Sequence, residues 1–242
     1  MTNLTIVNSQ VHLDLRVSPQ PTREIAEMNA VSVIPREFPR LLAHYPIFFL
    51  KSQESGRFEP VALLGFELKE NLFFTQGRWD VDYVPLQIQR QPFSLIPRAA
   101  AAGEPASLDL AIDLDSAQVQ PEGTERLFSA DGKATKYLED RASILQALVS
   151  GSTEAYAFTS RLAELGLLET VQIKVEFVDR SEKTLQGLYW IATAALDKLT
   201  AAQLMGLRDR KYLEWLYFQM ASLAQVSQLV ARKNRLISGV AR

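Results

Sequence analysis

The spacing of hydrophobic residues changes about halfway along the chain, and this change limits the folds open to it. In the first half apolar and polar residues alternate, as at Trp79, Val81 and Tyr83 and again over residues 108–115. A period of two is typical of half-buried strands. Residues 155–165 instead step by three and four, as in helices. We predict an α+β fold, with an antiparallel sheet in a strand-rich N-terminal half, then C-terminal helices and a further strand pair.

Local signals place several of these elements. Residues 61–68 and 71–75 are two apolar runs separated by a short polar break, a spacing that suits a hairpin. Residues 171–177 alternate, and residues 185–191 return after a polar turn, which predicts the further strand pair. Gly166 stands where the helix before it is expected to end.

The last segment holds the longest helical pattern in the chain. Thr200 and Gln203 have the spacing of a capping box, which predicts a helix start. From Asp209 to Arg235 an apolar seam recurs at intervals of three and four residues, and we expect it to pack across its own sheet. The alternative is a partner helix, including a homodimer, with candidate contacts at Leu213, Leu216, Met220 and Leu223.

Length and composition bound the remaining possibilities. The 242 residues suit a single domain over 1–242, with a sub-boundary near 98–106 as the alternative. A net charge of −2 provides no field to attract a phosphate backbone, so we expect no nucleic-acid partner. The sequence has no cysteine, which excludes disulfides, thiolate metal sites and a thiol nucleophile.

The same sequence bears on location. Its longest apolar runs, residues 47–50 and 61–66, are far too short to span a membrane. Polar residues interrupt the N-terminal segment, which also lacks the basic start of a signal peptide. We expect a soluble, cytoplasmic protein, with surface association by another route as the alternative.

The inventory of catalytic groups is small. The only two histidines, His12 and His44, have different local settings and no carboxylate at ligand spacing, so they are weak metal candidates. Asp109, Asp113 and Asp115 share the polar face of an alternating strand, where solvation is the usual fate. We therefore predict no catalytic residue, no metal site and no cofactor, and we favour a protein that is not an enzyme.

The run YVPLQIQRQPF at residues 83–93 is expected to form a corner of the core, and Arg90 is the position in it where a ligand contact is the alternative. The run follows a predicted strand face and combines prolines, aromatics and an arginine. The ligand- or peptide-binding candidates are Trp79, Tyr83, Arg90 and Phe93. Arg90 carries a donor fork suited to a carboxylate, and we expect an intramolecular acid, Glu67 or Asp82, to be its partner.

Segments along nearly the whole chain resemble the SapC family of bacterial proteins. They occur in the order expected for that family and are peculiar to it. They are HLDLRV (12–17), REFPRLLAHYPIFF (36–49), PVALLGFELKENLFF (60–74), GRWDVDYVPLQIQRQPF (77–93), ERLFSADGKATKYLED (125–140), LLETVQIKVEF (167–177), LQGLYWIATAALDKL (185–199) and YLEWLYFQMASLAQVSQLVARKN (212–234).

The resemblance implies a modest function. The family takes its name from a protein linked to a bacterial surface layer, and is distinct from the membrane permease of the same name. By gene order, members of the family look like companions of halogenase-like or oxygenase-like proteins and of outer-membrane receptors. This association implies an accessory role in peptide modification. We therefore expect a non-catalytic protein that binds a protein or peptide partner, such as a modification enzyme or a cell-surface system. The alternatives are an enzyme or small-molecule binder around Trp79, Tyr83 and Arg90, and a surface-layer component.

Overall fold

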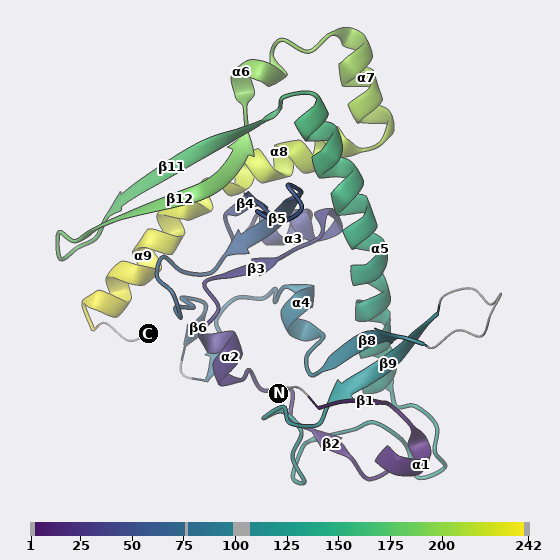
Figure 1. Ribbon diagram of the computed structural model, residues 1–242. Coiled ribbons are helices and arrows are strands. Elements are labelled where there is room, and N and C mark those ends of the chain that lie inside the picture. Colours follow the sequence, from purple (N-terminus) through teal and green to yellow (C-terminus); the bar gives the residue numbers. More distant parts are fainter. Residues whose placement is uncertain (1–2, 76, 99–106, 240–242) are drawn as a thin grey trace. The chain divides into compact units, whose positions relative to one another are not determined.

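The computed structural model of the chain describes residues 3–75, 77–98 and 107–239. The chain divides into two units, each assembled from two separate stretches of sequence. The first unit comprises residues 1–25 and 86–149, and the second comprises residues 26–85 and 150–242. Helices accompany antiparallel sheets, which confirms the α+β class (Figure 1). The single domain stays a prediction, and the sub-boundary proposed near 98–106 falls almost wholly outside the described residues.

The first unit is built on a small antiparallel sheet. Its central strand is β9 (Leu108–Asp113), which confirms the strand predicted from alternation, and its neighbours are β1 (Leu4–Ile6) and β8 (Phe93–Pro97). A second pair joins β2 (Arg16–Val17) to β10 (Glu125–Arg126). The short helices are α1 (Ser9–His12) and α4 (Leu86–Gln89). The buried core of this unit consists of Val17, Phe93, Ile112, Leu127, Phe128, Leu138 and Leu145.

The second unit contains a five-stranded antiparallel sheet in the order β11-β12-β4-β5-β3. Its strands are β3 (Ala30–Ser32), β4 (Ile47–Lys51), β5 (Phe58–Leu63), β11 (Leu168–Glu176) and β12 (Glu182–Ile191). The pairing of β11 with β12 confirms the strand pair predicted from alternation. A separate two-stranded hairpin joins β6 (Phe74–Thr75) to β7 (Arg78–Trp79).

The longest helix is α5 (Lys136–Glu164), and it contributes residues to both units. Gly166 follows it with φ +64°, a left-handed conformation that favours glycine, so the predicted helix end is confirmed. The capping box of Thr200 and Gln203 is also confirmed, at the start of the helix α7 (Ala201–Asp209). The remaining helical segments are α2 (Arg23–Ala26), η1 (Pro35–Glu37), α3 (Phe38–Leu41), α6 (Thr193–Leu196), α7 (Ala201–Asp209), α8 (Tyr212–Ser222) and α9 (Gln225–Ile237).

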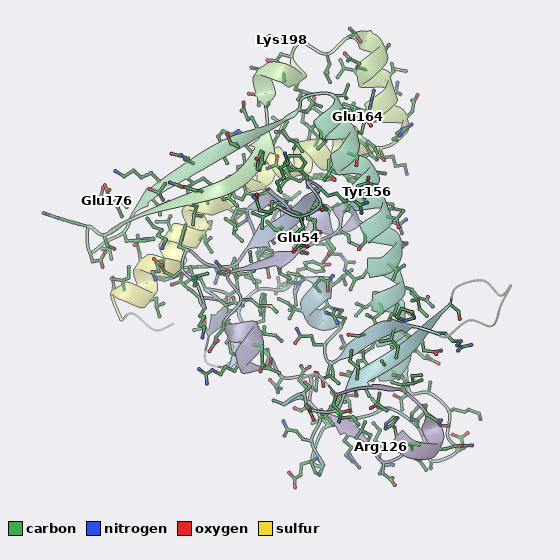
Figure 2. The ribbon with its side chains drawn as sticks, in the orientation of Figure 1. Glu54, Arg126, Tyr156, Glu164, Glu176 and Lys198 are labelled. Atoms are coloured by element: carbon green, nitrogen blue, oxygen red, sulfur yellow. The ribbon has the colours of Figure 1, made fainter. Side chains whose placement is uncertain are left out.

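Phe158 of α5 forms the centre of the second unit's core. Its fully buried ring packs edge-on against Tyr212 and Trp215 of α8, with centroids 5.3 and 5.4 Å away. Phe38 of α3 and Phe49 of β4 complete the group. Aromatic side chains from a helix, a strand and two further helical segments therefore meet at one residue. Polar and charged side chains such as Glu54, Glu164, Glu176 and Lys198 are exposed instead (Figure 2).

Two strand predictions from the first half are wrong. The apolar run 61–68 does not form a hairpin with residues 71–75, because β5 ends at Leu63 and pairs with β3 and β4. The alternation that begins at Trp79 does not continue as a strand, because β7 ends at that residue.

The single helix predicted over residues 209–235 is also wrong, because it is interrupted twice. Lys211 adopts φ +62° before α8, and α8 ends at Ser222, ahead of α9. The Oγ of Ser222 accepts a hydrogen bond from Ile47 N at 2.9 Å and donates to Gln219 O at 2.6 Å, while Gln219 Nε2 donates to Ile47 O at 2.8 Å. The end of α8 is thus bonded to the first residue of β4, and serine bonding back to its own helix favours a bend.

Candidate functional site

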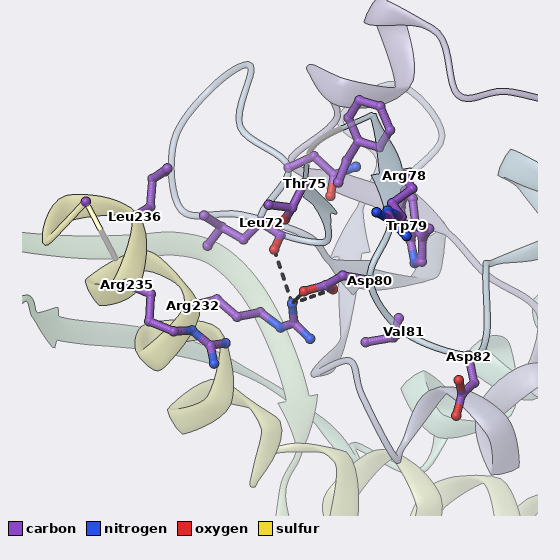
Figure 3. A pocket seen from close by; sticks show the side chains of 13 residues that line it. Leu72, Thr75, Arg78, Trp79, Asp80, Val81, Asp82, Arg232, Arg235 and Leu236 are labelled. Atoms are coloured by element: carbon purple, nitrogen blue, oxygen red, sulfur yellow. Dashed lines mark hydrogen bonds and ion pairs between the residues drawn. The ribbon is translucent and has the colours of Figure 1, made fainter. Parts of the chain in front are cut away.

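A pocket of about 760 Å³ opens in the second unit between the β6–β7 hairpin and the end of α9 (Figure 3). We call it the β7–α9 pocket. One wall comes from the hairpin and the residues around it, and the other comes from the last turn of α9. The lining residues are Asn71, Leu72, Phe74, Thr75, Arg78, Trp79, Asp80, Val81, Asp82, Arg232, Arg235, Leu236 and Gly239.

The aromatic ring of Phe73 supports the pocket from behind. Trp79 stacks on it nearly parallel, with centroids 6.3 Å apart, and Tyr45 lies 4.4 Å away. The guanidinium carbon of Arg232 is 4.4 Å from the centroid of the same ring. Because Phe73 is fully buried, it fixes the positions of the Trp79 and Arg232 side chains that line the pocket.

A chain of hydrogen bonds holds the indole of Trp79 in the wall. Its Nε1 donates to the hydroxyl of Tyr45 at 2.6 Å, and that hydroxyl donates to the carbonyl oxygen of Tyr83 at 2.5 Å. The hydroxyl of Tyr83 donates in turn to Oε1 of buried Glu37 at 2.9 Å. Each hydroxyl already has an acceptor, so we assign these groups to positioning the wall.

Burial is the main cause of the raised pKa values of Tyr45 and Tyr83, the two tyrosines that take part in these hydrogen bonds. It raises the pKa of Tyr45 well above the usual tyrosine range, although the hydrogen bond from Trp79 acts in the opposite direction. The pKa of Tyr83 is raised first by burial and then by the negative charge of Glu37. Both phenols are therefore neutral near pH 7, as hydrogen-bond donation to the Tyr83 carbonyl and to Glu37 requires.

The charges of the pocket wall are only partly paired. Nη1 of Arg232 contacts the two carboxylate oxygens of Asp80 at 2.6 and 2.7 Å and the carbonyl of Leu72 at 3.4 Å. Arg235 lies three residues further along the same helix and is half-buried. Within the described part of the chain, its side chain has no hydrogen-bond or ion-pair partner. The pocket therefore combines aromatic and aliphatic surface with an available cation.

Contacts on the flanks of α9 hold its end in place. Lys233 pairs with Glu70, a carboxylate that also accepts hydrogen bonds from the backbone of Phe66 and Glu67. The Oδ1 of Asn234 accepts a hydrogen bond from Val178 N at 2.9 Å, next to the turn between β11 and β12. The helix that carries Arg232 and Arg235 is thus fixed on two sides.

The four ligand candidates predicted from sequence belong to different units. Trp79 lines the β7–α9 pocket, and Tyr83 supports that wall through its carbonyl and hydroxyl. Arg90 and Phe93 are part of the first unit, where Phe93 is fully buried in the core.

The predicted pairing of Arg90 with Glu67 or Asp82 is wrong. Arg90 Nε donates to Gln87 Oε1 at 2.7 Å, and its Nη1 donates to Phe93 O at 2.7 Å and to Ser94 Oγ at 3.0 Å. Glu67 pairs with Lys183 instead. Burial lowers the pKa of Arg90, and its neutral acceptors come from residues close in sequence. Arg90 therefore stabilises the turn between α4 and β8.

The other candidate residues have separate roles. His12 is buried in the first unit, where its Nδ1 accepts a hydrogen bond from Asn8 N, and His44 lies edge-on to Tyr45 in the second. The carboxylate of Asp109 binds Arg98, and this contact lowers its pKa. Over residues 3–75, 77–98 and 107–239, no three histidine or acidic side chains form a group that could hold a metal ion.

The predicted partner-helix residues lie on α8 and just after it. Leu216 is fully buried within the unit, while Leu213, Met220 and Leu223 are half-buried. The α8 helix contacts α3, β4 and β12, as expected for a helix that packs on its own sheet. A homodimer through this helix stays a prediction.

Asp80, Arg232 and Arg235 line the pocket but are not among the candidate residues predicted from the sequence. Basic residues near the end of a helix commonly offset the negative end of its dipole, so the basic segment alone does not indicate a ligand site. The spacing of three residues between Arg232 and Arg235 can be read from the sequence, and it places both on one face of a helix. Their position opposite Asp80, about 150 residues earlier in the chain, follows only from the tertiary structure.

Comparison with known proteins gives one match. A family model described as SapC matches residues 7–229. The search of curated proteins found no match, and neither did the search of solved structures. No helix in the described part of the chain has both the length and the apolar character needed to cross a membrane.

Proposed function

The chain belongs to the SapC family, and we propose that it is a non-catalytic accessory protein that binds a peptide or protein partner in the β7–α9 pocket. The observation that carries the proposal is the composition of the pocket wall. Trp79 and exposed Leu236 provide apolar contact area, and Arg235 provides donors that no described residue uses. Tryptophan and arginine dominate the binding energy at many protein contacts. Halogenase-like or oxygenase-like modification enzymes are our candidate partners.

The rigidity of the wall supports the same proposal. Trp79 is held by Phe73 on its face and by the Tyr45 hydroxyl at its indole nitrogen. A partner that binds such a wall does not have to immobilise these side chains, so less free energy is lost on association. A small-molecule ligand is the second candidate, because the volume of about 760 Å³ lies within the range of small-molecule sites.

Affinity selection from a random peptide library, followed by calorimetry on the selected peptides, tests the proposal. The informative variant is Leu236→Asp, because Leu236 is 65% exposed and its replacement should leave the fold intact. The matched control is Val11→Asp, a helical residue that is 73% exposed in the first unit.

We expect the selected peptides to bind Leu236→Asp at least about ten-fold more weakly, and Val11→Asp as tightly as the unchanged protein. Selection of no peptide, or equal binding to Leu236→Asp, would overturn the proposal. A thermal-shift screen with small aromatic and carboxylic fragments tests the second candidate, a small-molecule ligand. Fragments that stabilise the unchanged protein but not Leu236→Asp would then favour a small-molecule site.

A further inference from the structure

We infer that the β7–α9 pocket recognises a carboxylate carried next to an apolar side chain, the combination found at the C-terminus of a peptide. This inference rests on the proposed function and names the chemistry of the ligand. It follows from the way the pocket distributes its charges between α9 and the segment after β7 (Figure 3).

Arg232 fixes the geometry of the helix side. Its Nη1 is occupied by the two oxygens of Asp80, and its plane is held over Phe73. With only 13% of its side chain exposed, Arg232 has little freedom to leave this position. Because Asp80 balances its charge, Arg232 acts mainly as a fixed part of the wall.

Arg235 is the cation that remains available. It is half-buried and lines the pocket one turn after Arg232. The end of α9 carries a partial negative charge that a nearby arginine offsets, but that interaction leaves the guanidinium N–H groups open to an acceptor. A carboxylate matches the planar donor fork of a guanidinium, which can bind both oxygens at once.

The remaining charges favour a ligand with a single negative charge. Arg78 and Asp82, both exposed, also line the pocket, together with the ion pair of Arg232 and Asp80. Two aspartates near the site would repel a dianion such as a phosphate group more strongly than they repel a carboxylate. The excess of one arginine over the aspartates therefore fits a monoanion.

The apolar part of the ligand has a matching surface. Leu72, Trp79 and Leu236 lie among the lining residues with Arg235. Leu236, at 65% exposure, directly follows Arg235 on α9, so a bound apolar group would remove it from water. A C-terminal leucine, for example, would place a carboxylate and an aliphatic side chain within one residue.

Calorimetry with paired ligands tests this inference. The probes are selected peptides that end in leucine, made with a free or an amidated C-terminus, and the small molecules N-acetyl-leucine and N-acetyl-leucinamide. Arg235→Gln removes the cation, and Arg210→Gln is the control, since Arg210 is an exposed arginine of the same unit with no side-chain partner among the described residues. Circular dichroism and thermal unfolding verify that both variants fold.

We expect amidation to weaken binding to the unchanged protein at least ten-fold. Arg235→Gln should weaken binding of the free acid to a similar extent and leave binding of the amide unchanged, while Arg210→Gln should alter neither. If the free acid and the amide bound equally well, or if Arg235→Gln weakened the binding of both equally, the inferred recognition of a carboxylate would be overturned. The proposed binding of a peptide would not be affected. If N-acetyl-leucine bound but no peptide did, the recognition of a carboxylate would be supported and the proposed peptide function would be overturned. Failure of every carboxylate probe to bind would overturn the inference as well.

Discussion

The indole Nε1 of Trp79 donates a hydrogen bond to the hydroxyl of Tyr45 at 2.6 Å, which joins a pocket residue to a fully buried one. The same hydroxyl donates to the carbonyl of Tyr83. One oxygen atom thus links the β7 segment to the residues that follow it. The position of the pocket wall depends on a side chain that does not itself line the pocket.

Replacement of this oxygen should destabilise the protein. In Tyr45→Phe the indole N–H and the Tyr83 carbonyl both lose their partner, and a buried polar group left without one costs about 1–3 kcal/mol. We expect the free energy of unfolding, measured by urea denaturation, to fall by that amount. Tyr217→Phe, at a site that is 54% exposed, is the control and should change it by less than about 0.5 kcal/mol. A Tyr45→Phe protein as stable as the unchanged one would contradict this assignment.

The raised tyrosine pKa values predict a loss of stability in alkali. Burial favours the neutral phenol of Tyr45, Tyr83 and Tyr137 in the folded state, whereas unfolded tyrosine ionises near pH 10. The stability that these groups contribute is complete below about pH 10 and is lost as the pH rises above it. Each phenol that stays protonated only in the folded state should cost about 1.4 kcal/mol per pH unit there.

Urea denaturation between pH 9 and pH 11 measures this effect. The free energy of unfolding should fall over the interval, and it should fall less steeply in Tyr45→Phe, which has one buried phenol fewer. Absorbance at 295 nm reports ionised tyrosine, and the part of the signal that belongs to Tyr45, Tyr83 and Tyr137 should appear only as the protein unfolds. Parallel profiles for Tyr45→Phe and the unchanged protein would show that Tyr45 ionises normally when folded.

Two helical glycines should respond in opposite ways to replacement by alanine. A Cβ at Gly151 in α5 would lie within 3.0 Å of three atoms of the buried Ile34 side chain, so Gly151→Ala should cost about 1–3 kcal/mol through overpacking. A Cβ at Gly206 in α7 would meet no heavy atom within 4 Å. Gly206→Ala should therefore gain about 0.5–1 kcal/mol from helix propensity. Thermal unfolding compares the two, and a stabilising Gly151→Ala would mean that α5 does not approach Ile34 so closely.

The side chain of Arg90 should stabilise the fold of the first unit. Arg90→Gln removes the donors to the Phe93 carbonyl and to Ser94, and we expect a loss of about 1–3 kcal/mol in urea denaturation. Arg126→Gln is the matched control, because Arg126 is exposed in the same unit. If both variants were equally stable, the hydrogen bonds of Arg90 would contribute little to this turn.

Short-range features of the sequence anticipated much of the secondary structure. The alternation at Leu108–Asp113 forms β9. The alternating run 171–177 and the run 185–191 that returns after a polar turn pair as β11 and β12. Gly166 and the Thr200–Gln203 pair marked a helix end and a helix start. These features predict secondary structure correctly because each depends on residues only a few positions apart. The hydrophobic period, left-handed glycines and caps therefore require no knowledge of the rest of the chain.

Contacts between distant segments decided the candidate site and most of the errors. The helix predicted through Ser222 ends there because Ser222 and Gln219 bond to Ile47, a residue more than 170 positions away. The acid expected near Arg90 is absent among its described partners, since turn carbonyls and side chains take its donors. The pocket depends in the same way on Asp80 meeting Arg232. The hydrophobic periods, the helix caps and the fold class can be predicted from the sequence, because each depends on residues close together in the chain. The pairing of the strands and the absence of a described partner for Arg235 depend on residues that are distant in sequence, so they follow only from the folded arrangement.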